Sequence, residues 1–262
     1  MNQDAFNWLL VIMTLSGAAV FAALYFIDAG YGMLSSPGWG RKIPNKYGWF
    51  LMEAPVFVLM LLIWLLYGEG ATPVTLILFT LFMIHYLHRA FIYPLLLVGN
   101  SKMPLSIVLM GCTFNVINAA MQGGWLFIFA PDGYYHEGLK WLSTPQFITG
   151  ILLFFTGMAI NIDSDRRLRK ARREGALRGE TGGHYIPEGG LFRQVTSANY
   201  FGEIVEWTGF ALMSWSVPGA IFAWWTFANL VPRAASTFRK HKAVNPAIIE
   251  ERRLKRVFPF IY

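Results

Sequence analysis

The chain has 262 residues, of which 55% are hydrophobic and only 14% are charged. A soluble domain of this length does not need so much apolar surface for its core, so the composition excludes an ordinary soluble protein and indicates an integral membrane protein. The formal net charge of +7 does not indicate nucleic-acid binding, because the basic residues lie in the segments that separate apolar runs.

Seven apolar runs approach the length of about 20 residues at which a helix spans a bilayer. They are predicted at 7–27, 49–67, 73–98, 104–130, 146–162, 200–216 and 218–232. The first run is not typical of a secretory signal, because no Lys or Arg precedes it and its apolar stretch is too long, so we expect it to stay in the mature protein. The sequence thus predicts an all-α integral membrane protein, a single domain over 1–262 with seven transmembrane helices.

The basic residues predict the orientation of these helices. Most of them lie between the first and second runs, between the fifth and sixth, and after the seventh, whereas Lys140 falls on the other face and Arg89 lies inside a run. Because positively charged loops stay in the cytosol, we expect the N-terminus outside, the C-terminus in the cytosol, and two cytosolic segments at 163–197 and 233–262. An endoplasmic reticulum membrane and a bacterial inner membrane both fit this pattern.

The single cysteine, Cys112, excludes a disulfide framework and a thiolate metal site, and no metal is expected.

Ionisable residues inside a span are costly unless they are paired or wetted, so they indicate function. The stretch "SANYFGEIVEW" (197–207) places Asn199, Glu203 and Glu206 on one side of a helix. One interpretation is capping, since acids favour the positive end of the helix dipole, although Glu206 lies a turn too far along for that. The other is a polar cavity whose carboxylates bind the ribose hydroxyls or the carboxamide of a nucleotide cofactor.

A second polar cluster interrupts the third run in "MIHYLHRAFIY" (83–93). Tyr86, Arg89 and Tyr93 share a helical face there, and His85 and its neighbours could form an inter-helix hydrogen-bond network. The second run contributes a lone acid, Glu53. A buried carboxyl beside a phenol is a plausible general-acid pair that polarises a substrate oxygen.

A third cluster, "NIDSDRRLRKARR" (161–173), places Asn161 and Asp165 on the same helical face as Arg169 and Arg172. Such a charge run is commonly a flank that binds lipid headgroups, but the acids within it favour a site for pyrophosphate and ribose together. The Gly-rich segment "GETGGHYIPEGGLF" (179–192) predicts a loop that covers a ligand. No G-x-G-x-x-G or G-x-x-x-x-G-K-[ST] motif occurs, so a nucleotide site would have to be built by the spans themselves.

Five stretches together resemble one known family: "WFLMEAPVF", "HYLHRAFIYPLL", "GMAINIDSD", "IPEGGLFRQVTSANYFGEIVEWTGFAL" and "FPFIY". From about residue 45 to its end the chain is similar to the steroid 5α-reductases, integral membrane reductases that use NADPH. The resemblance implies a cofactor cavity inside the bundle, open to the cytosol, and reduction of the double bond of a 3-oxo-Δ4 steroid or a similar lipophilic enone. The implied partners are that substrate and membrane lipid, with no nucleic acid and no evident protein partner.

By position, the resemblance implies that Glu53 and Tyr86 hold the carbonyl oxygen of the substrate while hydride passes from NADPH to the β-carbon. The implied cofactor contacts are Asn161, Asp165, Arg172, Tyr185, Asn199, Glu203, Arg233 and His241. The implied substrate walls are Trp49, Met52, Tyr93, Met110, Phe114 and Trp207, and further polar cavity positions are Arg89, Asn118, Gln122 and Glu206.

The chain departs from the animal steroid enzymes mainly around the substrate. Met52 stands in place of a glutamine and Met110 in place of an arginine, whereas the cofactor positions match better. Two other classes fit the sequence less well: membrane methyltransferases of the isoprenylcysteine carboxyl type, which need no acid and tyrosine pair, and a non-catalytic sterol carrier, which would not need the polar set around Asp165 and Glu203.

Overall fold

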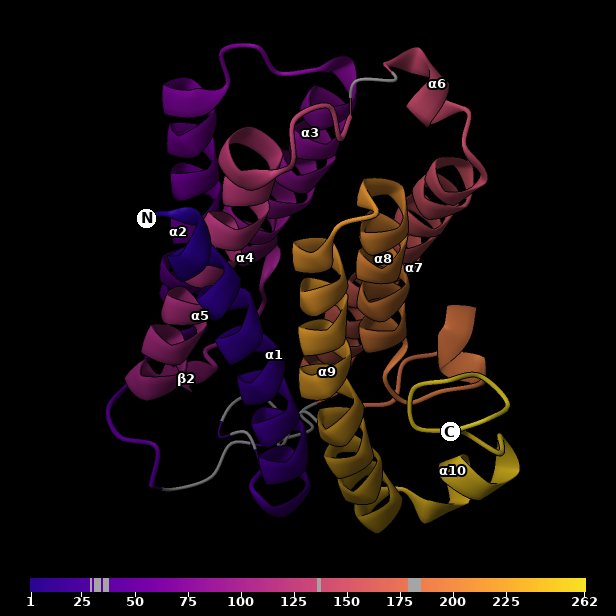
Figure 1. The fold of residues 1–262 in the computed structure, drawn as a ribbon. Coiled ribbons are helices and arrows are strands. Elements are labelled where there is room, and N and C mark those ends of the chain that lie inside the picture. Colours follow the sequence, from indigo (N-terminus) through magenta and orange to yellow (C-terminus); the bar gives the residue numbers. More distant parts are fainter. Residues whose placement is uncertain (29, 31–33, 35–37, 136–137, 179–184) are drawn as a thin grey trace.

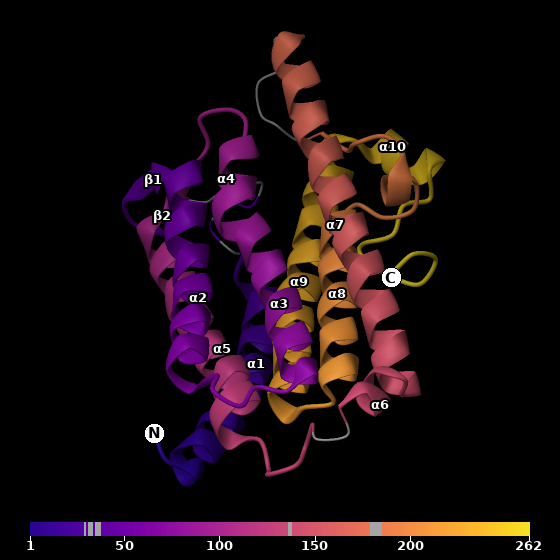
Figure 2. The ribbon, with the colours of Figure 1, turned by 90° about the horizontal axis from the view of Figure 1, so that it is seen from above.

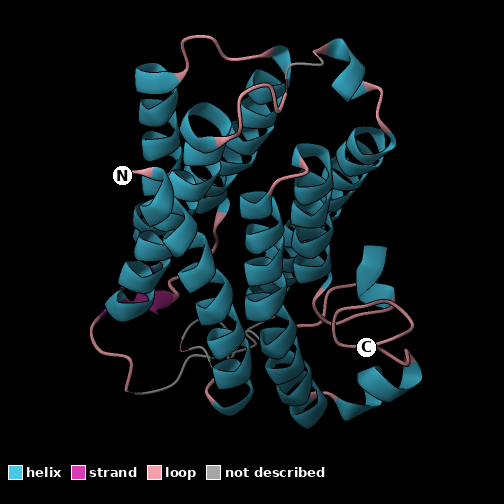
Figure 3. Cartoon of the chain, in the orientation of Figure 1, coloured by secondary structure: helices cyan, strands magenta, loops and turns pink. Residues whose placement is uncertain are grey.

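Helices form most of the computed structural model, which describes residues 1–28, 30, 34, 38–135, 138–178 and 185–262 (Figures 1 and 3). The first elements are α1 (Gln3–Phe26), β1 (Lys42–Pro44), α2 (Asn45–Tyr67), α3 (Pro73–Leu87), the π-helix η2 (His88–Ile92), α4 (Tyr93–Leu96), β2 (Lys102–Pro104), α5 (Leu105–Gly124) and the π-helix η3 (Trp125–Phe129). They are followed by α6 (Leu139–Leu142), α7 (Pro145–Leu177), the 3₁₀ turn η4 (Gly190–Arg193), α8 (Ala198–Ser214), α9 (Val217–Val244) and α10 (Pro246–Glu251).

The long helices run side by side and alternate in direction along the chain (Figure 2). The N-terminus and α6 lie at one end of the bundle, and β1, β2 and α10 lie at the other. The two short strands pair antiparallel, with Ile43 opposite Met103, and so join the start of α2 to the start of α5.

Five helical segments of the described chain are long and apolar enough to cross a membrane: Gln3–Phe26, Asn45–Tyr67, Pro73–Leu96, Leu105–Phe129 and Pro145–Gly175. They correspond to the first five predicted spans, so the expected membrane protein is supported. The sixth and seventh predicted spans fall on α8 and α9, where α8 lies beside α7 and α9 beside α8 (Figure 2). Because α8 has only 17 residues and α9 carries polar residues that lower its hydropathy, a total of seven spans stays a prediction.

Opposed glycines bring α7 and α8 into close contact. A Cβ on Gly150 would lie 2.6 Å from the Gly209 carbonyl oxygen, and a Cβ on Gly202 would lie 2.6 Å from the Asn161 nitrogen. Gly157 packs directly on the backbone of Glu206. Small residues at such a seam let two helix backbones approach closely in a membrane protein. The seam therefore fixes the polar residues of α8 against those of α7.

Several boundaries differ from the sequence prediction. The fifth predicted span ended at 162, but α7 continues to Leu177, so the first part of the segment 163–197 is helical rather than loop. Residues 179–184 of the predicted covering loop lie outside the described part of the chain. The segment after 232 also begins as helix, because α9 runs to Val244.

The last residues pack back on the bundle. The Thr196 and Ser197 nitrogens donate to the carbonyls of Lys255 and Arg256, at 2.9 and 3.1 Å. The Arg256 guanidinium lies 4.3 Å from the centre of the Tyr262 ring. The tail thus holds the segment that leads into α8, a role that the sequence did not predict.

Candidate active site

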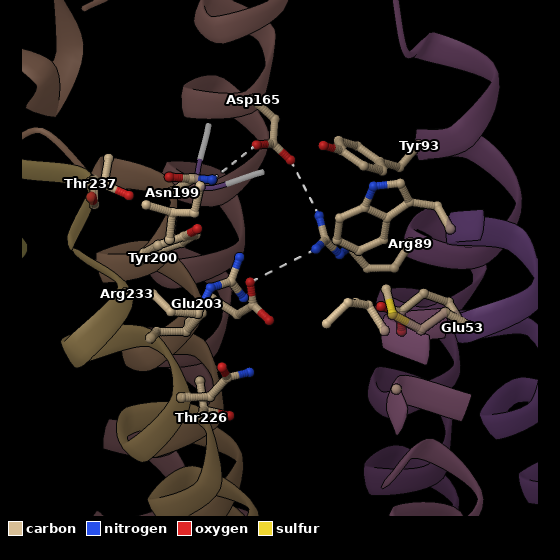
Figure 4. A pocket seen from close by; sticks show the side chains of 18 of the residues that line it. Glu53, Arg89, Tyr93, Asp165, Asn199, Tyr200, Glu203, Thr226, Arg233 and Thr237 are labelled. Carbon is tan, nitrogen blue, oxygen red and sulfur yellow. Dashed lines mark hydrogen bonds and ion pairs between the residues drawn. The ribbon is translucent and has the colours of Figure 1, made fainter. Parts of the chain in front are cut away.

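A cavity of about 460 Å³ lies inside the bundle. Its walls come from α1, α2, α3, η2 and α5 on one side and from α7, α8 and α9 on the other. Residues of α9 line it at helical spacing from Phe222 to His241, a length of roughly 28 Å at 1.5 Å per residue. The cavity is therefore elongated along the bundle, and Figure 4 shows its two walls facing each other.

Arg89 bridges the two walls. Its guanidinium carbon lies 4.7 Å from the ring centres of both Trp49 and Tyr93, so it is held between two aromatic faces. Its Nη1 donates to the Asp165 carboxylate at 3.3 Å, and its Nη2 lies 4.0 Å from the Glu203 carboxylate. Figure 4 shows these interactions crossing the cavity. Arg89, which the resemblance implied only as a further polar cavity position, is thus central to the electrostatics of the site.

The polar wall of α7 and α8 is bonded across the glycine seam. The Asn199 amide donates to Asp165 at 3.4 Å. The Asn161 amide donates to the Asn199 carbonyl oxygen at 3.0 Å and to Glu203 at 3.5 Å. Ser197, at the N-cap of α8, makes no side-chain cap hydrogen bond, and Glu203 lies a full turn beyond it. The contacts of Glu203 are therefore to Arg89 and Asn161, which argues against the capping interpretation.

Cationic side chains gather at one end of this wall. Arg169, Arg172, Arg233, His241 and Tyr185 all line the cavity. The ring of Tyr185 packs directly on Gly175 and so lies against α7. The Arg169 Nη1 atom is buried and has no hydrogen-bond partner in the described chain. A buried guanidinium nitrogen without an acceptor is costly, so this end of the cavity is suited to an anionic ligand group.

Glu53 lies on the opposite wall and is held by an amide. The Asn115 Nδ2 atom donates to the Met52 carbonyl oxygen at 2.8 Å and to a Glu53 carboxylate oxygen at 3.1 Å. An amide nitrogen has two protons, and both are used here. Asn115 was missed by the sequence analysis, although it lies three residues before Asn118 on the same predicted span and so adjoins it on the helix surface.

The Tyr86 hydroxyl oxygen is also held from behind. The Asn118 amide donates to it at 3.2 Å, and the Gln122 amide in turn donates to Asn118 at 3.3 Å and to the Pro218 carbonyl oxygen at 2.9 Å. A hydroxyl has one proton to donate, and here its oxygen already accepts a bond from Asn118. No direct hydrogen bond joins Tyr86 to Glu53 among the described residues, and both side chains line the same cavity. The phenolic proton therefore stays available to a ligand.

Apolar side chains surround Glu53 and Tyr86. Five of the substrate-wall residues that the resemblance implied line the cavity: Trp49, Met52, Tyr93, Met110 and Phe114. Phe222 and Trp225 of α9 pack against the Phe114 ring and line the cavity as well. One part of the cavity is therefore mainly apolar and holds a carboxyl and a phenol, and the other is densely charged.

Five predicted site residues do not line the cavity and lie one layer behind its wall. Asn118, Gln122 and Asn161 support lining residues through the hydrogen bonds described above. Trp207 is only 1% exposed because Phe222 and Tyr86 cover it, with ring centres at 4.3 and 5.9 Å. Glu206 is also 1% exposed and pairs with His85. Helical spacing predicted the interior positions of Asn161 and Glu206, and the resemblance implied those of the other three. Neither reveals which neighbours stand in front of these residues.

The chain is similar in sequence to one protein family and to several known proteins. The family described as 3-oxo-5-alpha-steroid 4-dehydrogenase matches residues 101–262. The chain is 37% identical to the steroid 5-alpha-reductase DET2 of Arabidopsis thaliana over 100% of its own length and 98% of that protein. It is 39% identical to the 3-oxo-5-alpha-steroid 4-dehydrogenase 1 of Homo sapiens, over 83% of this chain and 81% of the human protein. The corresponding protein of Mus musculus is 38% identical over 89% of this chain and 90% of its own length.

Proposed function

Because this chain belongs to the 3-oxo-5-alpha-steroid 4-dehydrogenase family of oxidoreductases that act on CH–CH groups, we propose that it reduces the Δ4 double bond of a 3-oxo steroid, or of a similar lipophilic enone, with NADPH. The observation that carries the proposal is a single cavity with two chemically different parts. An apolar part holds a carboxyl and a phenol, and a charged part holds several arginines and carboxylates. A flat lipid ketone suits the first part and a nucleotide suits the second.

At the apolar part, Tyr86 donates its phenolic proton to the carbonyl oxygen of the substrate. The Asn118 amide fixes the tyrosine oxygen, so the proton points away from Asn118. Glu53, held by Asn115, lies in the same pocket and in its protonated form adds a second donor to that oxygen. Two donors that are already oriented stabilise the negative charge that develops on the oxygen as the double bond is reduced. The apolar side chains exclude water and strengthen both bonds.

At the charged part, the residues fit a dinucleotide. The arginines that line the cavity, among them Arg172 and Arg233 and the unpartnered nitrogen of Arg169, suit the phosphates. Asp165, Asn199 and Glu203 offer acceptors and an amide donor for ribose hydroxyls and a carboxamide. NADPH bound there would supply the hydride that the β-carbon receives. Tyr185 and His241 line the same part and would contact the cofactor with their rings.

The membrane arrangement belongs to the same proposal. We place seven spans in one domain over 1–262, with α8 and α9 as the sixth and seventh, the N-terminus outside and the C-terminus in the cytosol. The basic residues of α7 and of the tail then lie in the cytosol, where NADPH is available. The segment 163–197 would cover the cofactor, and the host membrane would be the endoplasmic reticulum or a bacterial inner membrane.

The test is an activity screen of the purified protein in detergent. It combines NADPH with a panel of enones that includes progesterone-like and testosterone-like steroids, and mass spectrometry identifies the products. The proposal predicts NADPH oxidation and a product two mass units heavier than its enone. A non-catalytic sterol carrier would instead retain steroid without changing NADPH fluorescence, and that result would overturn the proposal.

A further inference from the structure

Behind Tyr86 lies a buried pair of ionisable residues that the proposed mechanism does not use. His85 Nδ1 and Glu206 Oε1 are 2.7 Å apart, and the two residues are 4% and 1% exposed. The Trp207 ring covers the imidazole, with ring centres 4.5 Å apart. The contact joins α3 to α8, and thus the two walls of the cavity.

His85 nevertheless reaches the cavity, because it is one of the lining residues whereas Glu206 is not. The only hydrogen bond of its ring to another described residue is made by Nδ1. The other ring nitrogen, Nε2, therefore has no described protein partner. Tyr86 is the next residue along the chain, with ring centres 5.0 Å apart. The imidazole thus lies beside the phenol that binds the carbonyl oxygen.

The pair is poorly explained as a purely structural contact. Burying two ionisable groups costs several kcal/mol, which their mutual attraction repays only when every polar atom is satisfied. Here the Glu206 Oε2 atom is buried and has no partner in the described chain. Well-packed apolar residues would hold α3 and α8 together at least as well. A carboxylate that orients one nitrogen of an imidazole is, however, a common arrangement for a histidine that transfers a proton through the other nitrogen.

We propose that His85, oriented by Glu206, is the acid that protonates the α-carbon of the substrate. The inference rests on the proposed function. Hydride adds its electron pair and hydrogen to the β-carbon, so the carbon–carbon double bond becomes an enolate whose oxygen is held by Tyr86 and Glu53. The His85 Nε2–H bond then breaks, its proton forms the new bond at the α-carbon, and the neutral ring regains a proton from water. The sum is one enone, one NADPH and one proton converted to one ketone and one NADP⁺.

The experiment compares isotope effects on kcat in wild type and in a His85→Gln variant, which keeps a polar side chain but cannot transfer a proton. Two effects are measured: that of deuterated solvent and that of NADPH deuterated at the transferred position. If His85 is the acid, kcat falls by about 10²-fold, the solvent isotope effect rises because protonation limits the rate, and the cofactor isotope effect falls toward unity. The affinity for NADP⁺, measured by equilibrium titration without turnover, stays unchanged.

Two further variants separate a proton donor from a structural contact. Glu206→Gln should shift both isotope effects in the same direction with a smaller loss of kcat, because an amide orients the imidazole less firmly than a carboxylate does. His88→Gln, three residues along the same stretch and outside the cavity lining, should leave both isotope effects at their wild-type values. Wild-type isotope effects in active His85→Gln and Glu206→Gln variants would overturn the inference, as would a weaker NADP⁺ affinity with unchanged isotope effects. A wild-type protein that reduces no enone would contradict the proposed function itself.

Discussion

The two walls of the cavity are built in different ways. On the α7 and α8 wall, the charged and amide groups bond directly to one another, as in the Asn199 contact with Asp165 and the Asn161 contact with Glu203. On the opposite wall, Glu53 of α2 and Tyr86 of α3 lie beside apolar side chains, and each is held from behind by an amide of α5. The first wall is a shared network suited to a highly charged ligand. The second offers a few oriented donors to a ligand that is almost entirely apolar.

Met52 and Met110, which the resemblance contrasts with a glutamine and an arginine of the animal steroid enzymes, both lie on the second wall. Met110 is 61% exposed on the surface of α5 and lines the cavity as well, so it forms part of the boundary between the pocket and the outside of the bundle. Substrate selectivity is therefore expected to depend on the second wall, and cofactor binding on the first.

The largest expected effect comes from Glu53 on the second wall. Glu53→Gln should lower kcat by about 10²–10⁴-fold, because an amide cannot donate the proton of a carboxylic acid in the same way. The affinity for NADPH should stay near the wild-type value, because Glu53 does not belong to the first wall. Steady-state kinetics and an NADPH titration check both parts, with Glu69→Gln in the α2–α3 connection as the control. A kcat close to the wild-type value would remove Glu53 from the mechanism.

On the first wall, Glu203→Ala should act chiefly on the cofactor. Loss of hydrogen bonds made by a charged group weakens binding by about 10- to 100-fold, so the Kd for NADPH should rise by that factor. Fluorescence titration of the purified variant measures it, and Glu174→Ala on the exposed part of α7 is the matched control. Unchanged NADPH affinity would show that Glu203 serves only the stability of the helix pair.

The seam that supports the first wall gives the next prediction. Gly157→Ala places a methyl group against the Glu206 backbone and should lower the free energy of unfolding by about 1–3 kcal/mol, the usual cost of overpacking. Thermal unfolding in detergent measures the loss, and Thr156→Ala at the exposed neighbouring position should have little effect. If Gly157→Ala is as stable as wild type, α7 and α8 are not held at the close distance described.

The smallest effect is expected behind the second wall. Asn118→Ala removes the donor that holds the Tyr86 oxygen and should reduce kcat about five- to tenfold, the equivalent of one hydrogen bond of about 1 kcal/mol. The KM for NADPH should not change. Thr113→Ala, on the exposed side of the same helix, is the control. An unchanged kcat would mean that the tyrosine is oriented by other contacts.

Much of this arrangement could be predicted from the sequence, and the misses have physical causes. Apolar length alone located the first five spans, and helical spacing identified the interior faces of α7 and α8. Spacing could not show that Trp207 and Glu206 lie behind other side chains, because occlusion depends on the packing of helices distant in sequence. The end of α7 was placed too early because hydropathy falls where the helix becomes polar, although its backbone hydrogen bonds continue to Leu177.

The central claim, that one cavity brings a hydride donor to a lipid enone, is tested most directly by label transfer. The purified protein is incubated with a 3-oxo-Δ4 steroid and NADPH that carries deuterium at the transferred position, and the product is analysed by mass spectrometry and NMR. The account predicts a reduced ketone with one deuterium on the former β-carbon. A reduced product without deuterium at that carbon, or no product from any enone while NADPH stays intact, would contradict it.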